Sequence, residues 1–439
     1  MVEAIRREQI PARDLAARPS ILHVLEATLG GTLRYLSNII DASADMQFKM
    51  GWVYSTTRAS SGLLPALAQA RDADWELYNL DMARSISLAS DLRNAVKLRT
   101  IIRRNRPNIV HCHSSKAGAL GRLALMGLPR RPKLVYSPHA VAARLGSQYV
   151  FIERGLSRLT SRFAAVSESE RQELVDYGIA RESEIDVVYP AIDTEYFRPD
   201  SRPEARRQLG ICADAPLVLG IGRLTPQKDP LAFIHLVQRL LSTMPALTAI
   251  WVGDGELRCR MQEVLRAQRI EKAIQIVGWR DDVRPYLAAC DLLISTSQYE
   301  SFGYMVAEAL AMERPVVATK VAGTIDIMQQ DLAGFLYKTG DHADAARLAT
   351  ELLTNPQRAL TIGASGRRIV TNEFSKVRMG RTLQRCYVRL LDADRKEIED
   401  YEPKTLAHGL ARSAADFLRY RDYRLPLATS LRKGGRSRP

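Results

Sequence analysis

The stretch 291–323 reads DLLISTSQYESFGYMVAEALAMERPVVATKVAG, and its pattern indicates the fold class that we expect. Asp291–Ser297 is a short apolar run typical of a buried strand. After a polar loop, Tyr304–Met312 has strong helix formers, Pro315 ends the helix, and Val316–Thr319 opens another strand. The pattern predicts a strand–loop–helix–strand unit of an α/β fold. Its loop would lie at the carboxyl edge of a parallel sheet, where such sheets bind ligands.

The loop and the helix start form a candidate phosphate site between two carboxylates. Free backbone N–H groups at Phe302–Tyr304 and the positive end of the helix dipole favour an anion. Glu300 lies in the loop and Glu308 in the second helical turn, with seven residues between them. A carboxylate accepts hydrogen bonds from two hydroxyls at once, which suits a sugar. The plainer alternative is two ordinary solvated charges, because glutamate is usually exposed.

The composition is that of a soluble globular protein, 46% hydrophobic and 26% charged, and 439 residues allow two or three domains. No apolar run is long enough for a transmembrane helix, and the charged N-terminus is unlike a signal peptide. The net charge of +14 favours nucleic acid, an anionic membrane surface or phosphorylated ligands, without choosing among them. A cytoplasmic setting without disulfides or structural zinc is expected from five scattered cysteines, Cys112, Cys212, Cys259, Cys290 and Cys386.

Apolar runs alternate with helical patterns along the chain, which predicts two doubly wound Rossmann-like α/β domains facing a cleft. The irregular stretch Tyr189–Arg202 separates them. The second domain should have strands at Leu217–Arg223, Leu247–Gly253, Ala273–Gly278, Asp291–Ser297, Pro315–Thr319 and Gly334–Tyr337. We predict a polar extension at 1–20, a first domain at 21–195, a linker at 196–212, a second domain at 213–375, a helix crossing back to the first domain at 376–392, and a basic tail at 393–439.

Gly220–Pro230 reads GIGRLTPQKDP and offers two cations at the carboxyl edge of the second sheet. It lacks the third glycine of a dinucleotide fingerprint and the lysine spacing of a Walker motif. Arg223 ends a strand and Lys228 follows five residues later, so a forked guanidinium and a mobile ammonium could both face the helix start at Phe302. This arrangement suits a diphosphate that leaves without a metal. The alternative is two surface cations.

The first domain carries weaker candidates. His139 ends a strand and should face the cleft, where a neutral imidazole could bind a sugar hydroxyl or a phosphate, although such a histidine is often structural. Gly30-Gly31 lies between a strand and a helix and could let backbone approach a ligand, or simply make a tight turn. His111 and His113 point to one face, but two histidines without a third ligand make a poor metal site, so we predict none.

Two basic surfaces could meet an anionic membrane. Over Tyr149–Phe163, apolar residues recur at helical spacing beside Arg154, Arg158 and Arg162. The alternative is a core-facing helix with a solvated charged face. The second cluster is Lys97, Arg99, Arg103, Arg104 and Arg106.

In this order, the motifs resemble the retaining glycosyltransferases of the GT-B fold, specifically glycosyltransferase family 4, the group 1 family. The resemblance spans roughly residues 20–392. Within the family, the chain looks most like members that build capsule, exopolysaccharide or O-antigen. It is carried by Gly222-Arg223 with Lys228, Val252–Gly255, Val277–Val283, Glu300–Gly303 with Glu308, and Pro315–Thr319 with Gly323.

The resemblance implies roles for these residues. Glu308 would hold the nucleotide ribose, Glu300 and His139 would contact the donor sugar, and Arg223 and Lys228 would stabilise the leaving diphosphate. His139, Glu300, Arg223 and Lys228 are thus the expected catalytic residues. Expected donor-binding residues are Gly30, Gly31, Gly222, Arg223, Lys228, Gly278, Trp279, Ser301, Phe302, Gly303, Tyr304 and Glu308, and expected acceptor residues are Ser114 and Lys116.

The resulting hypothesis is a metal-independent, cofactor-free retaining glycosyltransferase in the cytoplasm, peripheral on the inner membrane. It would move a sugar from a nucleotide diphosphate donor to a polyprenyl-diphosphate-linked glycan. One alternative is a nucleotide-sugar epimerase of the same fold, which would need further acid–base groups in the cleft. The other is a basic nucleic-acid-binding protein, for which the sequence offers no recognition module.

Overall fold

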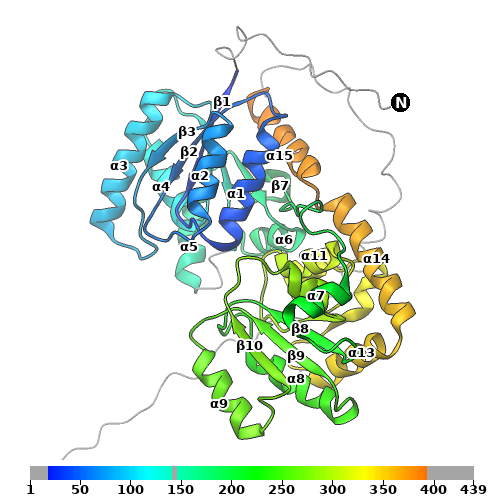
Figure 1. The fold of residues 1–439 in the computed structure, drawn as a ribbon. Coiled ribbons are helices and arrows are strands. Elements are labelled where there is room, and N and C mark those ends of the chain that lie inside the picture. The colour runs from blue at the N-terminus through cyan, green and yellow to red at the C-terminus, as the bar shows by residue number, and fades with distance from the viewer. Residues whose placement is uncertain (1–17, 141–145, 393–439) are drawn as a thin grey trace, which may run out of the picture. The chain divides into compact units, whose positions relative to one another are not determined.

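The computed structural model describes residues 18–140 and 146–392, and the described residues up to Leu391 belong to one compact unit (Figure 1). The expected tail at 393–439 and nearly all of the expected extension at 1–20 lie outside the described residues. Among the helices of the described chain, none combines the length and the apolar character that crossing a membrane requires.

The first domain is built on a parallel sheet with strand order β3-β2-β1-β4-β5-β6-β7. The order reverses between β1 and β4, which makes the carboxyl ends of these two strands the ligand-binding switch point of the sheet. Its strands are β1 (Ser20–Leu25), β2 (Lys49–Tyr54), β3 (Glu76–Asn79), β4 (Ile109–His113), β5 (Lys133–Ser137), β6 (Arg162–Ala165) and β7 (Ile185–Val187). Its helices are α1 (Gly30–Ser43), α2 (Leu63–Asp72), α3 (Leu88–Asn105), α4 (Ser115–Leu125), α5 (Ser147–Ser157), α6 (Glu168–Asp176) and the 3₁₀ turn η3 (Glu182–Glu184).

The second domain repeats the plan with a parallel sheet of order β10-β9-β8-β11-β12-β13. Its switch point lies between β8 and β11, the strands that precede the two motifs singled out in the sequence. Its strands are β8 (Leu217–Ile221), β9 (Thr248–Val252), β10 (Ile274–Gly278), β11 (Leu292–Ser295), β12 (Val316–Thr319) and β13 (Leu336–Tyr337). Its helices are α7 (Arg202–Leu209), α8 (Pro230–Thr243), α9 (Arg258–Gln268), α10 (Arg284–Ala289), α11 (Tyr304–Ala311), α12 (Ala322–Ile327), η4 (Gln330–Phe335), α13 (His342–Thr354) and α14 (Pro356–Glu373), and the chain continues into α15 (Lys376–Leu391).

Both faces of the first sheet are buried, and alternate residues of β1 serve different layers. Ile21 and Leu25 pack with α1, α2 and α15, whereas Leu22 and Val24 pack with α3 and α4. Because side chains alternate along a strand, His23 falls on the same face as Ile21. The helix α15 completes that layer by packing against α1, the first helix of the described residues.

Two expectations about local structure are wrong. The range 196–212, expected to be a linker, contains α7, which packs against α10, and Phe197 and Ala205 belong to the core of the second domain. The expected apolar stripe over Tyr149–Phe163 is not one helical face, because α5 ends at Ser157 and Phe163 is a buried residue of β6.

Candidate active site

The loop between β11 and α11 folds tightly onto the start of α12. The Gly323 N–H donates to the carbonyl oxygen of Glu300 at 3.0 Å. A Cβ atom on Gly323 would lie 2.5 Å from the backbone nitrogen of Phe302, so only glycine fits there. Gly303, which precedes α11, has a φ of 98°, again a glycine conformation. The predicted seat at the α11 N-terminus is therefore a rigid backbone turn that includes Ser301.

Glu300 and Lys228 are brought together although 72 residues separate them. Lys228 follows β8 and forms an ion pair with Glu300, which also accepts a hydrogen bond from the Ser297 hydroxyl at 2.7 Å. Thr296 fixes the lysine backbone by donating to its carbonyl oxygen at 2.9 Å. Gly222 leaves room for the lysine stem, since a Cβ there would lie 3.0 Å from Lys228 Cγ. The ends of β8 and β11 thus supply one cation and one nearly buried carboxylate.

Glu308 lies one helical turn further into α11 and is almost fully buried. Its Oε1 forms an ion pair with the guanidinium of Arg34, whose side chain is 46% exposed against 2% for Glu308. Its Oε2 has no hydrogen-bond partner among the described residues. Burial raises the pKa of Glu308, and the Arg34 charge opposes that rise. A buried, unsatisfied carboxylate oxygen is an acceptor site for a ligand hydroxyl or a water.

The double glycine after β1 meets the start of α11. The Tyr304 hydroxyl donates to the carbonyl oxygen of Gly31 at 3.2 Å, and a Cβ on Gly31 would lie 3.1 Å from the tyrosine ring. Gly30 has a φ of 58°, in the left-handed region that glycine adopts without strain. Arg34 lies 5.7 Å from the centroid of the Tyr304 ring. The glycine loop is therefore adjacent to the carboxylate Glu308 through Tyr304 and Arg34.

The other expected donor-site residues lie at the same carboxyl edge of the second sheet. Arg223 follows β8, is exposed, and has no ion-pair partner within residues 18–140 and 146–392. Gly278 ends β10 with a φ of 77°, and its carbonyl oxygen accepts from the Gly253 N–H at 2.9 Å. Trp279 is 60% exposed, and its indole N–H donates to Asp281 at 3.1 Å.

His139 stands at the end of β5 with a φ of 60°, an uncommon conformation for a residue other than glycine. Its Nε2 lies 3.2 Å from Nδ1 of His113, and its ring meets that of Tyr35 edge-on at 4.7 Å between centroids. The expected acceptor residues have other partners. Lys116 pairs with Asp91 of α3 at 2.7 Å, and Ser114 caps α4.

Two groups of side chains at the site were not predicted from the sequence. Arg34 could not be paired with Glu308 there, because the two residues lie 274 positions apart. His23, His111 and His113 are fully buried, and each offers a ring nitrogen within 4.8 Å of the others. The third histidine that the sequence lacked for a metal site is thus His23, which lies in the middle of the apolar run Ile21–Leu25 of β1. However, both nitrogens of His111 are already engaged, by Tyr387 at 2.7 Å and by Ser137 at 2.9 Å.

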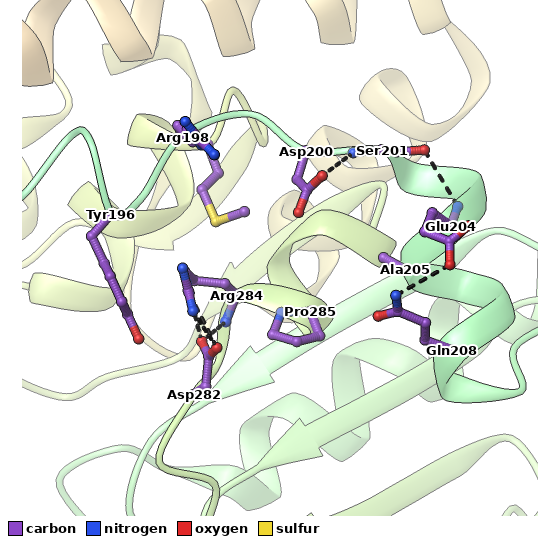
Figure 2. Close-up of a pocket in the computed structure, with 11 residues that line it drawn as sticks. Tyr196, Arg198, Asp200, Ser201, Glu204, Ala205, Gln208, Asp282, Arg284 and Pro285 are labelled. Atoms are coloured by element: carbon purple, nitrogen blue, oxygen red, sulfur yellow. Dashed lines mark hydrogen bonds and ion pairs between the residues drawn. The ribbon is translucent and has the colours of Figure 1, made fainter.

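A separate cavity of about 180 Å³ lies between the segment 196–201, α7 and the start of α10 (Figure 2). Within it the Arg284 guanidinium lies over the Tyr196 ring, 3.8 Å from the centroid, and pairs with Asp282. Figure 2 shows both acids and cations around this hollow. None of the expected site residues lines it, so the cavity is distinct from the cluster around α11.

Comparison with known proteins identifies both halves of the chain. Residues 29–196 match the family described as Glycosyltransferase Family 4, and residues 201–369 match Glycosyl transferases group 1. A relative from Escherichia coli, the UDP-Gal:alpha-D-GlcNAc-diphosphoundecaprenol alpha-1,3-galactosyltransferase, is 24% identical over 71% of this chain and 82% of its own length. The capsular polysaccharide biosynthesis glycosyltransferase CapM of Staphylococcus aureus is 24% identical over 70% of this chain and 83% of its own.

Solved structures share the fold. A glycosyltransferase from Rickettsia africae superposes with a TM-score of 0.72 at 20% identity, covering 86% of this chain and 99% of that one. Anabaena Alr3699/HepE, solved in complex with UDP and glucose, gives 0.71 at 21% identity, covering 84% and 99%. Two parallel-sheet Rossmann-like domains in this order form the GT-B fold. With both halves matched, the chain belongs to glycosyltransferase family 4, the group 1 glycosyltransferases.

Proposed function

We propose that this protein is a retaining glycosyltransferase that moves a sugar from a nucleotide diphosphate sugar onto a polyprenyl-diphosphate-linked saccharide during polysaccharide assembly. The observation that carries the proposal is the buried Oε2 of Glu308 in the second turn of α11, which has no hydrogen-bond partner among the described residues. A ribose hydroxyl would donate to this oxygen, while Oε1 stays with Arg34. The start of this helix then faces the diphosphate.

The diphosphate would be held by charges that the protein itself supplies. Lys228 and Arg223 follow the same strand, and the α11 N-terminus adds backbone N–H groups. During transfer, the acceptor hydroxyl forms a bond to the anomeric carbon as the bond to the diphosphate oxygen breaks. The electron pair leaves with the diphosphate, and the hydroxyl proton passes to a phosphate oxygen. Lys228 and Arg223 stabilise the developing negative charge, which in other sites is the task of a metal ion.

Glu300 and His139 would contact the donor sugar. Glu300 keeps one oxygen for Lys228 and Ser297, which holds the carboxylate in a fixed orientation. Retention of configuration is the stereochemical outcome that the family resemblance implies. Nuclear magnetic resonance of the fresh product distinguishes the anomers, and an inverted product contradicts this part of the proposal.

The acceptor is proposed from the relatives. The E. coli relative is named for a diphosphoundecaprenol-linked acceptor. Such a lipid requires contact with a membrane, and α3 offers an exposed apolar line four residues apart, Leu88, Leu92 and Val96, with Arg93 and Lys97 exposed beside it. Co-sedimentation with phosphatidylglycerol vesicles tests this surface. Equal binding of the wild type and a Leu92→Glu variant would contradict it.

The decisive experiment on the donor site uses Glu308→Ala. A thermal-shift panel of UDP, GDP, ADP and their sugars first identifies the nucleotide that stabilises the wild type. Loss of the ribose hydrogen bond to a charged group should then weaken binding of that nucleotide by about 10- to 100-fold, as measured by calorimetry. Glu271→Ala, on the exposed surface of the same domain, serves as the matched control. Unchanged affinity in Glu308→Ala would overturn the proposal, and loss of transfer in EDTA would overturn its metal independence.

A further inference from the structure

Three histidine rings are joined end to end behind the first-domain edge of the site. Nδ1 of His23, on β1, lies 3.0 Å from Nε2 of His113, on β4. Nδ1 of His113 lies 3.2 Å from Nε2 of His139, which follows β5. His23 and His113 are fully buried, whereas His139 is half-buried. The row therefore leads from the interior of the sheet to its carboxyl edge.

All three rings are neutral, because burial lowers the pKa of His23 and of His139 to about 3 and that of His113 well below its ordinary value. A neutral imidazole has one N–H donor and one acceptor nitrogen. Each hydrogen bond in the row therefore fixes the tautomer of the next ring. Only two arrangements satisfy both bonds, and they differ in the direction in which all the protons point.

The inner end of the row favours one direction. Nε2 of His23 is buried without a partner among the described residues, and so is the indole N–H of Trp52. These residues face each other in register on neighbouring strands, so their side chains share one face of the sheet. An N–H on His23 Nε2 would leave two buried donors on that face without acceptors, whereas an unprotonated Nε2 leaves one donor and one acceptor. This favours the proton of His23 on Nδ1.

The consequence passes along the row. With the proton of His23 on Nδ1, this N–H would donate to Nε2 of His113, and His113 would carry its own proton on Nδ1 and donate to Nε2 of His139. His139 is then left with Nδ1–H as its donor. The Tyr35 ring edge and the left-handed backbone of His139, with a φ of 60°, hold this ring in place. Such local strain persists where surrounding contacts enforce it.

We propose that His23 and His113 are positioning residues that hold His139 as its Nδ1–H tautomer, so that the site receives a neutral hydrogen-bond donor for a sugar or phosphate oxygen. The identity of that oxygen rests on the proposed function, whereas the tautomer does not. His111 lies outside the row, since its nitrogens bond to Tyr387 and Ser137.

The direct test is the ring tautomer in the full-length protein without ligand. The chain has seven histidines, so ¹⁵N-histidine labelling gives few signals, and single substitutions assign them. Long-range ¹H–¹⁵N spectra at pH 7.5 should show His139 protonated on Nδ1, with a pyridine-like Nε2. The opposite tautomer, or a charged ring, would overturn the proposal. So would stoichiometric zinc in the purified protein with metal shifts on His23 and His113.

Two variants test the positioning role. His113→Leu removes the donor to His139, so a mixture of His139 tautomers should appear and kcat/KM should fall about tenfold, the value of one neutral hydrogen bond. His113→Asn retains a donor group near the Nδ1 position and should restore both the single tautomer and most of the activity. An unchanged His139 spectrum in a folded His113→Leu protein would overturn the proposal. If the protein has no transferase activity, the spectra still decide the tautomer, so the two failures are distinguishable.

Discussion

The carboxyl edges of the two sheets differ in electrical character, although both sheets are parallel and both reverse their strand order at a switch point. The second-domain edge is ionic, with an Lys228–Glu300 pair and the buried Glu308. The first-domain edge is neutral where β4 and β5 end, with His113 and His139 hydrogen-bonded to each other, whereas an Arg58–Glu26 ion pair lies beyond β1 and β2. Arg34 extends from the first domain to the second and pairs with Glu308.

The difference follows from what each buried group can use as a partner. A carboxylate stays charged in a low-dielectric site only when a cation or several donors compensate it, as Lys228 and Ser297 do for Glu300. An imidazole avoids the cost by losing its proton and pairing with another imidazole. The ionic edge suits a charged leaving group, and the neutral edge suits an uncharged sugar. The two edges should therefore respond differently to substitution and to pH.

The largest expected effect is on the ionic edge. Lys228→Ala removes the cation nearest to Glu300 and should lower kcat by about 100- to 1000-fold, as for loss of one electrostatic donor to a developing anion. The measurement is a transfer assay with the nucleotide sugar found by thermal shift. The unfolding midpoint should also fall, because the nearly buried Glu300 loses its cation, so the assay is run well below that midpoint.

Lys272→Ala is the matched control, since this lysine is exposed on the same domain. It should retain wild-type kcat. Full activity in Lys228→Ala would remove the electrostatic distinction between the edges.

The neutral edge should make stability depend on pH. Burial lowers the pKa of His23, His111, His113 and His139 far below 6.5, so between pH 6.5 and about 3 the unfolded chain binds more protons than the folded one. Their contribution is present above pH 6.5 and is lost as the pH falls. Asp326 acts in the opposite sense, because burial raises its pKa to about 7. The net change is roughly three protons, or about 4 kcal/mol of unfolding free energy per pH unit below pH 6.

Denaturant unfolding between pH 5 and 7.5 measures this slope. Asp326→Asn removes the opposing carboxyl and should steepen the slope to roughly four protons, about 5.4 kcal/mol per unit. His235→Asn, at an exposed position of the second domain, should leave the slope unchanged. A slope of one proton or less in Asp326→Asn would mean that the buried rings accept protons and that the first-domain edge is not neutral.

The fold could be predicted because its signals are local. Apolar runs predicted β11 and β12 to within two residues, and the helix predicted at 376–392 is α15, which ends at Leu391. The helix α7 was also readable, since Ser201 caps it and Gly210 ends it with a φ of 65°. The prolines around it led us to expect a linker instead. The prediction of one helical stripe over Tyr149–Phe163 was wrong, because apolar residues happen to keep a helical period across the turn between α5 and β6.

The candidate site also has one part that could be predicted from the sequence and one part that could not. The pairing of Lys228 with Glu300 could be anticipated, since both follow strands of one sheet and parallel strands end at a common edge. The histidine row could not, because it depends on the register that places His23 beside His111, 88 residues later. Nothing in a sequence alone fixes that register. The role of Arg34 could not be predicted either, because its partner Glu308 belongs to the other domain.

Substitution of Arg34 should have the smallest effect on activity. It tests whether the second-domain edge depends on a cation from the first domain. The charge of Arg34 opposes the rise in the pKa of Glu308 that burial causes. Without it, Glu308 should titrate at a higher pH, and the donor should bind only to the ionised carboxylate. Arg34→Ala should therefore move the acidic limb of the kcat/KM profile to higher pH and reduce kcat/KM at pH 7 by about tenfold. Arg34→Lys keeps the charge and should keep the limb near its wild-type position. An unmoved limb in Arg34→Ala would mean that Glu308 does not need the first-domain cation, and that the two edges act independently.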